Sequence, residues 1–234
     1  MESRALVLHP GCLSKSTPSP LIVYLHGWNQ SGNGKTVAEL QHVKDRGSRG
    51  LLANLERLPS LRASLIFAPQ CPKGSWWDVQ RVWKLVKAYV DSGIYHIDNI
   101  VLVGVSMGGY AAFEMLHSHA DAFSSVVIIG GGDDPYRSLA VRMVLCVTGI
   151  VASVANVDAI SLHPRLPRVY IVHGAWDPVV PLASALRCAK HLQPWARVDF
   201  TVVPFCANPL GLGHWAWCAP CCRSDEWWEA VLSH

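Results

Sequence analysis

A serine stands at the centre of the pentapeptide Gly104-Val105-Ser106-Met107-Gly108. An apolar run, 99–103, precedes this pentapeptide and a helix-forming run, 110–115, follows it. The serine is therefore predicted to occupy a tight corner between a strand and a helix. Such a corner strains the backbone and lifts the hydroxyl clear of the sheet, while small neighbours let strand and helix approach closely. The pattern predicts that Ser106 is a nucleophile.

A serine hydroxyl needs a base to take its proton, and usually a carboxylate to orient that base. Asp177 follows the buried-strand pattern 168–173, and His214 lies beyond the next strand pattern, 198–203. The carboxyl ends of parallel strands share one edge of a sheet, so the three side chains are expected to meet there. We therefore predict Asp177 as the acid and His214 as the base.

Acyl transfer also needs donors for the negative oxygen of its tetrahedral intermediate. The strand pattern 20–25 ends in a bend, His26-Gly27-Trp28-Asn29, whose amides can turn towards the serine. We expect the backbone N–H groups of Trp28 and of Met107, the residue after the nucleophile, to form this oxyanion hole. His26 is expected to bond to nearby backbone and to shape the loop.

These motifs together resemble the α/β-hydrolases of the phospholipase/carboxylesterase type, a group that includes acyl-protein thioesterases and predicted esterase/peptidase relatives. The matching segments occur in the family's order: Leu25-His26-Gly27, Ala68-Pro69-Gln70-Cys71-Pro72, Tyr95-His96-Ile97-Asp98, Gly104–Gly109, His173–Pro181 and Gly213-His214-Trp215-Ala216-Trp217. The resemblance implies the same nucleophile, acid, base and oxyanion donors at these positions, and no cofactor. It also implies carboxylic esters, lysophospholipids or acyl thioesters as substrates.

The length of 234 residues, half of them apolar, predicts one α/β domain over residues 1–234. Strand patterns at 21–26, 64–68, 99–105, 125–130, 168–173 and 198–203 alternate with helical patterns. The clearest helical pattern is 77–91, and the last is 224–232. This alternation favours an α/β-hydrolase fold, a mostly parallel central sheet with helices on both faces. The segment 133–165 forms either a small cap or lid over the site or an ordinary helix against the sheet.

The bulk composition excludes several classes of protein. The 234 residues carry 20 basic and 17 acidic side chains, a net charge of +3, with no basic cluster to bind nucleic acid. The apolar region 139–160 is interrupted by Arg142, Asn156 and Asp158, which argues against membrane insertion. No long apolar segment opens the sequence, so a cytoplasmic protein is expected. No sequence feature indicates an oligomeric state.

The chain has eight cysteines. Five of them fall in or near predicted core segments and are expected to be buried free thiols: Cys12, Cys71, Cys146, Cys188 and Cys206. Cys218, Cys221 and Cys222 follow His214 with loosely metal-like spacing. A zinc ion there would remove the predicted base, and the chain has no second CxxC, so no metal site is predicted. The redox state of these three cysteines stays open.

Tryptophans stand beside the predicted acid and the predicted base. Trp76, Trp77, Trp176 and Trp215 are predicted to wall an apolar acyl pocket, the alternative being that each belongs to the core. The expected activity is that of a serine esterase acting on a small-molecule or lipid ester or thioester. The alternatives are a serine peptidase of related fold and a non-catalytic ligand-binding α/β-hydrolase.

Overall fold

A seven-stranded sheet forms the centre of the computed structural model, which describes residues 5–8, 15–45, 52, 57–148, 167–204, 214 and 219–233. In the order β1-β3-β2-β4-β5-β6-β7, every neighbouring pair is parallel except β1 and β3. The strands are β1 Ala5–Leu8, β2 Ser19–Leu25, β3 Leu65–Pro69, β4 Ile97–Val105, β5 Ser125–Ile129, β6 Arg168–Gly174 and β7 Val198–Val203. The six predicted strands are confirmed within two residues at each end, whereas β1 was not predicted.

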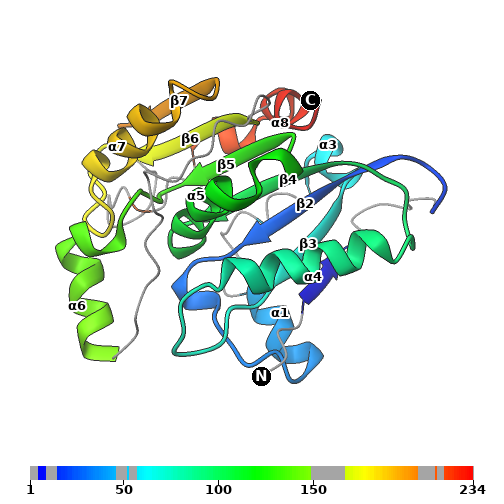
Figure 1. Cartoon of the computed structure of the whole chain (residues 1–234), viewed down its shortest axis with the longest axis horizontal. Helices are drawn as coiled ribbons and strands as arrows, with labels where there is room; N and C mark the ends of the chain where they lie inside the picture. The colour runs from blue at the N-terminus through cyan, green and yellow to red at the C-terminus, as the bar shows by residue number, and fades with distance from the viewer. Residues whose placement is uncertain are drawn as a thin grey trace.

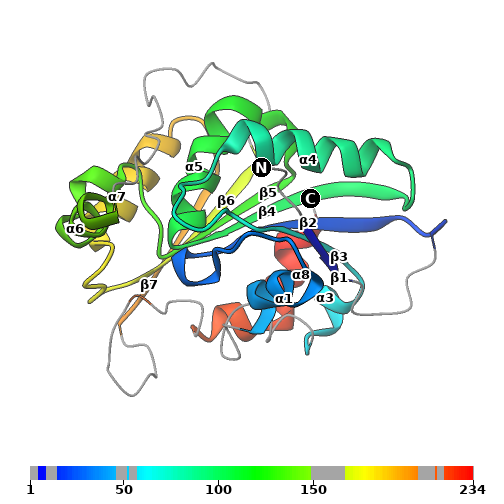
Figure 2. The same cartoon turned by 90° about the horizontal axis from the view of Figure 1, so that it is seen from below.

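Helices cover both faces of this sheet (Figure 1). The helices are α1 Val37–Asp45, α3 Pro59–Arg62, α4 Val79–Asp91, α5 Met107–His119, α6 Leu139–Thr148, α7 Leu182–Leu192 and α8 Asp225–Leu232. Figure 2 shows α4, α5 and α7 on one face and α1, α3 and α8 on the other. The predicted α/β-hydrolase architecture is confirmed.

Alternate residues of the strands belong to two separate hydrophobic cores, because successive side chains point to opposite faces of a sheet. Along β2, Leu21, Val23 and Leu25 pack with α4, α5 and α7, whereas Ile22 and Tyr24 pack with α1, α3 and α8. β5 is buried along its whole length. A strand of a sheet that is covered on both faces therefore needs apolar residues at nearly every position.

The predicted helices 77–91 and 224–232 are both present, and side-chain caps set where they begin. α4 begins two residues later than predicted because the Asp78 carboxylate accepts the Arg81 N–H at 3.0 Å and so caps the first turn. Gly93, at φ 61°, follows the end of that helix. α8 begins after Ser224, whose hydroxyl accepts the Trp227 N–H at 3.3 Å, and this helix buries Trp228.

Only the first part of the predicted cap segment 133–165 is described. It contains α6, which stands beyond the carboxyl ends of the strands (Figure 1). Leu145 is buried there, while Met143 and Val147 are 62% and 86% exposed. Residues 149–166 lie outside the described part of the chain.

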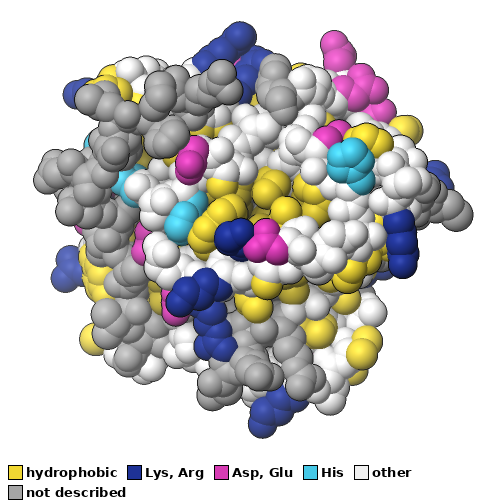
Figure 3. Space-filling model, turned by 45° about the vertical axis from the view of Figure 1, so that its right-hand side comes forward, with side chains coloured by type: hydrophobic (Ala, Val, Ile, Leu, Met, Phe, Trp, Pro, Cys, Tyr) yellow, Lys and Arg dark blue, Asp and Glu magenta, His cyan; other side chains and the backbone are white. Residues whose placement is uncertain are grey.

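On the face in Figure 3, Lys and Arg side chains occur at several separate places and do not gather into one large patch. No helix in the described ranges is both long enough and apolar enough to cross a bilayer.

Candidate active site

Ser106 occupies a strained corner between β4 and α5. Its backbone has φ 54° and ψ −116°, and it is the sole described residue other than glycine with a positive φ. The Ser106 N–H donates to the Ile129 carbonyl at 2.8 Å, and the Ser106 carbonyl accepts the Gly109 N–H at 2.8 Å. A conformation of this kind costs about 1–3 kcal/mol and persists only where its surroundings enforce it.

Glycines make the corner possible by allowing backbones to approach. A Cβ on Gly108 would overlap the Leu25 carbonyl oxygen, and one on Gly104 would overlap the Gly108 carbonyl oxygen. A Cβ on Gly109 would lie 2.8 Å from Gly131 Cα. Helix α5 therefore packs directly on the ends of β2 and β4, which fixes the position of Ser106.

The predicted acid and base both lie next to this serine. His214 Nε2 is 2.9 Å from Ser106 Oγ, and His214 Nδ1 is 2.8 Å from Asp177 Oδ2. Asp177 follows β6 and His214 follows β7, so the three residues come from separate loops at one edge of the sheet. If Nδ1 donates to the carboxylate, Nε2 is left as the acceptor that a proton on Ser106 requires.

Asp177 is held by backbone as well as by His214. Its side chain is fully buried, and Oδ1 accepts the N–H groups of Val179 at 2.8 Å and Val180 at 2.9 Å. His173 Nε2 lies 3.7 Å from Asp177 Oδ2 but donates to the Val180 carbonyl at 2.8 Å. Burial lowers the pKa of His173, so this second imidazole is a neutral neighbour of the carboxylate.

The two predicted oxyanion donors flank the serine. Trp28 opens the 3₁₀ turn η1 (Trp28–Gln30) and Met107 opens α5. Neither amide donates a hydrogen bond within the part of the chain that the structure describes. A Cβ on Gly27 would lie 3.3 Å from Ser106 Cβ, so the turn lies against the serine. Free N–H groups at the start of a helical turn are suited to bind a negative oxygen.

His26 fixes the loop that carries Trp28, as predicted. Its Nδ1 lies 2.7 Å from the Gly27 carbonyl oxygen, and its Nε2 accepts the Cys71 N–H at 3.0 Å. The ring is completely buried, and this burial lowers its pKa to about 4. A neutral imidazole with one donor and one acceptor satisfies both contacts.

The predicted pocket tryptophans have different surroundings. Trp76 and Trp77 line a cleft of about 210 Å³ next to the start of α4. Trp77 is buried and donates its indole N–H to the His26 carbonyl at 3.2 Å. Trp176 is 71% exposed, and Trp215 lies outside the described residues. Sequence reasoning missed Tyr110, whose ring lies 5.9 Å from that of Trp76.

The described cysteines are free thiols. Cys71 and Cys188 are buried as predicted, whereas the prediction is wrong for Cys146, which is exposed on α6. Cys221 and Cys222 have their sulfurs 4.0 Å apart, and the hydrogen bond from Cys222 lowers the pKa of Cys221 to about 7. Among the described residues no group of three metal-ligating side chains occurs. Cys12, Cys206 and Cys218 lie outside these residues.

A mostly parallel sheet, a strained serine after β4 and the loops of Asp177 and His214 at the same edge are features of the α/β-hydrolase fold. No family model matches the chain, and no curated protein matches its sequence. Solved structures do match it, at 23% identity or less in those compared, which shows the shared fold.

Three solved structures illustrate the likeness. A thermostable esterase superposes with a TM-score of 0.69 at 23% identity, over 98% of this chain and 58% of its own. A phospholipase/carboxylesterase from Dyadobacter fermentans superposes with a TM-score of 0.54 at 17% identity, over 88% of each chain. Oligopeptidase B from Leishmania major superposes with a TM-score of 0.66 at 11% identity, over 99% of this chain but 35% of its own. The present chain thus spans little more than half of the length of that thermostable esterase.

Proposed function

We propose that this protein is a serine hydrolase that cleaves carboxylic esters or thioesters through an acyl-enzyme. The observation that supports this most directly is the hydrogen-bonded series from Ser106 through His214 to the buried Asp177, with distances of 2.9 and 2.8 Å. Esterases among the solved structures of the same fold agree with it. A hydroxyl, an imidazole and a carboxylate in this order form the arrangement that activates a serine.

In the first half of the proposed reaction, His214 Nε2 removes the proton from Ser106 Oγ as the oxygen attacks the ester carbonyl. The N–H groups of Trp28 and Met107 stabilise the oxyanion that forms. His214 then gives its proton to the departing alcohol or thiol. Asp177 keeps the imidazole oriented and stabilises its positive charge.

In the second half, a water molecule takes the place of the departed group. His214 removes a proton from this water, whose oxygen attacks the acyl-enzyme. Collapse of the second tetrahedral intermediate breaks the bond to Ser106 Oγ and releases the carboxylic acid, and the serine recovers its proton from His214. No cofactor or metal takes part in these steps.

We further propose that α6 belongs to a cap over the site in a single catalytic domain. Its buried Leu145 packs against Trp28 and Trp76, at the oxyanion turn and the tryptophan cleft. An apolar contact at that place would limit the size of the bound acyl group. Substitution of Leu145 by Ala is expected to raise kcat/KM for long-chain p-nitrophenyl esters relative to the acetate. An unchanged chain-length profile would contradict the cap.

Labelling with a fluorophosphonate probe tests the nucleophile. The probe is expected to label the wild type at Ser106 and to leave the folded Ser106→Ala variant unlabelled. Ser75→Ala, which changes a serine lining the neighbouring cleft, serves as the matched control and should be labelled like the wild type. Labelling that survives in Ser106→Ala would refute the nucleophile. An unlabelled wild type would favour a non-catalytic ligand-binding protein.

A peptidase of the same fold would use the same three side chains, and oligopeptidase B matches this chain in structure. Esters and amides of the same acyl group separate the two activities. An esterase is expected to hydrolyse the p-nitrophenyl ester with a far higher kcat/KM than the matching p-nitroanilide. Comparable values for both would favour the peptidase.

A further inference from the structure

Two buried hydrogen-bonding groups beside the proposed site have no partner. They are the hydroxyl of Tyr110 and the indole N–H of Trp76. Their rings lie 5.9 Å apart with planes inclined at 53°. Both belong to the described part of the chain, and neither makes a hydrogen bond to it. Most buried polar groups in proteins are paired, so two adjacent exceptions call for an explanation.

Both groups belong to the edge of the sheet where Ser106 lies. Tyr110 follows Ser106 by four residues, and its N–H donates to the Ser106 carbonyl at 3.3 Å. A Cβ on Gly132 would lie 3.3 Å from the Tyr110 ring, which places this ring against the turn that follows β5. Leu145 of α6 contacts Trp76 and Trp28. The two donors therefore lie between the oxyanion turn, the cap helix and the turn after β5.

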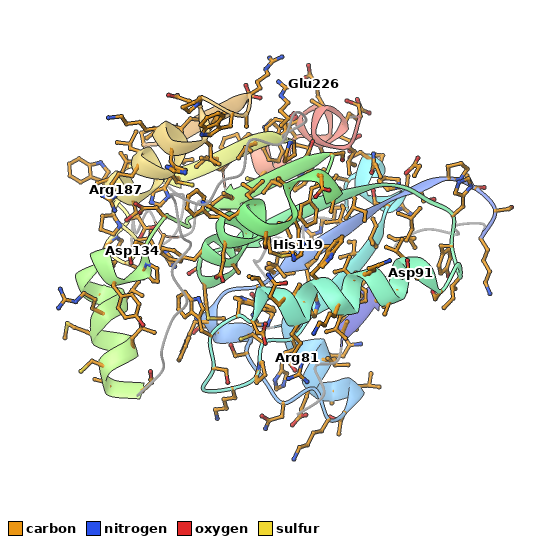
Figure 4. The ribbon with its side chains drawn as sticks, in the orientation of Figure 1. Arg81, Asp91, His119, Asp134, Arg187 and Glu226 are labelled. Carbon is orange, nitrogen blue, oxygen red and sulfur yellow. The ribbon has the colours of Figure 1, made fainter. Side chains whose placement is uncertain are left out.

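The surroundings of Tyr110 are firmly fixed. Arg187 of α7 donates to both carboxylate oxygens of Asp133, at 2.8 and 3.0 Å, and to Ser184 Oγ at 2.9 Å. These bonds attach the turn after β5 to α7, and Figure 4 shows Arg187 and the neighbouring Asp134 close to α6. Tyr110 itself is only 4% exposed. Its ring lies against this turn, and its hydroxyl is buried from solvent.

The chemistry of the two groups defines what they would bind. An indole N–H can only donate a hydrogen bond, and a phenol O–H donates most readily to an oxygen. Burial and the nearby Asp133 raise the pKa of Tyr110, so its hydroxyl keeps its proton. A buried donor without a partner lowers the stability of the folded protein, and a hydrogen bond to a ligand oxygen would remove this cost.

We propose that Tyr110 and Trp76 form an oxygen-recognising subsite for the substrate. On this proposal the ester carries a hydrogen-bond-accepting oxygen, such as a ketone, ether or hydroxyl oxygen, on the apolar body that packs among Trp28, Trp76 and Leu145. The inference rests on the proposed function and narrows it, because plain alkyl esters would leave both donors unpaired. It also revises the predicted apolar acyl pocket into an apolar pocket with two donors.

The oxygen can belong to the acyl group or to the leaving group, and two substrate series distinguish these sources. The first series compares p-nitrophenyl oxo-alkanoates, with the ketone moved outward one carbon at a time, with alkanoates of the same length. The second compares the acetate of 4-acetylphenol with that of 4-ethylphenol. In each pair the quantity measured is the ratio of kcat/KM with the oxygen to kcat/KM without it.

Tyr110→Phe removes one donor and leaves the ring in place. In at least one series the ratio is expected to fall about tenfold relative to the wild type, with kcat/KM for the plain ester nearly unchanged. Tyr89→Phe is the matched control, because the Tyr89 hydroxyl on α4 is also buried and unpartnered but its ring packs on Phe67 in the core. Its ratio should equal that of the wild type.

Trp76→Phe provides a second variant and is expected to lower the same ratio. The melting temperature of Tyr110→Phe should match or exceed that of the wild type, since the hydroxyl has no partner to lose. Ratios unchanged by both substitutions in both series would overturn the subsite while leaving Ser106-dependent hydrolysis intact. Absence of Ser106-dependent hydrolysis for every ester would instead overturn the proposed function.

Discussion

Relief of the strain at Ser106 should stabilise the protein while abolishing its activity. At φ 54° and ψ −116° a side chain is disfavoured, whereas glycine adopts such angles readily. Ser106→Gly and Ser106→Ala both remove the hydroxyl and its 2.9 Å contact with His214. Only the glycine variant also removes the Cβ, so the difference between the two variants isolates the backbone strain.

The size of this difference follows from two opposing terms. The strained conformation costs about 1–3 kcal/mol when a Cβ is present. Glycine loses about 0.5–1 kcal/mol more than alanine in backbone entropy on folding. The free energy of unfolding of Ser106→Gly should therefore exceed that of Ser106→Ala by about 1 kcal/mol. In a chain of this length that corresponds to about 2–4 °C in melting temperature.

Urea unfolding at pH 7.5, followed by circular dichroism, measures the difference directly. Equal slopes for both variants would show that the denatured states are comparable. Neither variant should hydrolyse esters above background. If Ser106→Ala proved as stable as Ser106→Gly or more so, the corner would not be strained and the argument for a conformationally enforced nucleophile would fail.

Three further predictions concern ionisable groups. The folded pKa of His26 is about 4 against 6.5 unfolded, so the unfolded state takes up the proton first and stability should fall by up to about 3 kcal/mol as the pH drops from 6.5 to 4. Urea titrations should show this loss in the wild type and a smaller one in His26→Gln. Asp177→Asn should lower kcat about 10⁴-fold in a folded protein, and a loss below tenfold would contradict its role. Alkylation of Cys221 by iodoacetamide, followed by peptide mass mapping, should be half-maximal near pH 7, and Cys222→Ala should move this midpoint upward; an unmoved midpoint would exclude the thiol pair as the cause.

Local sequence patterns could predict most of the sheet because its central strands are buried on both faces. β5 and β6 read as continuous apolar runs, and turns or glycines bound them. β1 has only four residues, of which Leu6 alone is buried. Its antiparallel register, with Ala5 opposite Pro69, depends on a partner more than sixty residues away. No local pattern contains that information.

The sequence could predict which side chains meet at the candidate site where chemistry restricts the residue type. It could not predict contacts that depend on burial. The motif around Ser106 and the loops after later strands led to Asp177 and His214. Trp176 stands beside the acid in sequence, yet the turn leaves it 71% exposed. The position of Tyr110 four residues after Ser106 was available as a signal. The sequence could not show that the Tyr110 hydroxyl lacks a hydrogen-bond partner, because this depends on which distant segments pack around it.

Under the proposed mechanism, the backbone and the side chain of Trp28 have separate roles. Under the proposed mechanism its N–H group stabilises the oxyanion, and Gly27 and the His26 contacts set the position of that amide. Its side chain packs against Leu145 of α6 instead. A bulky residue at the oxyanion turn is therefore compatible with catalysis, because catalysis there needs only the amide. Changes to the Trp28 side chain should alter which acyl groups fit, whereas changes that move Gly27 should alter turnover of every ester.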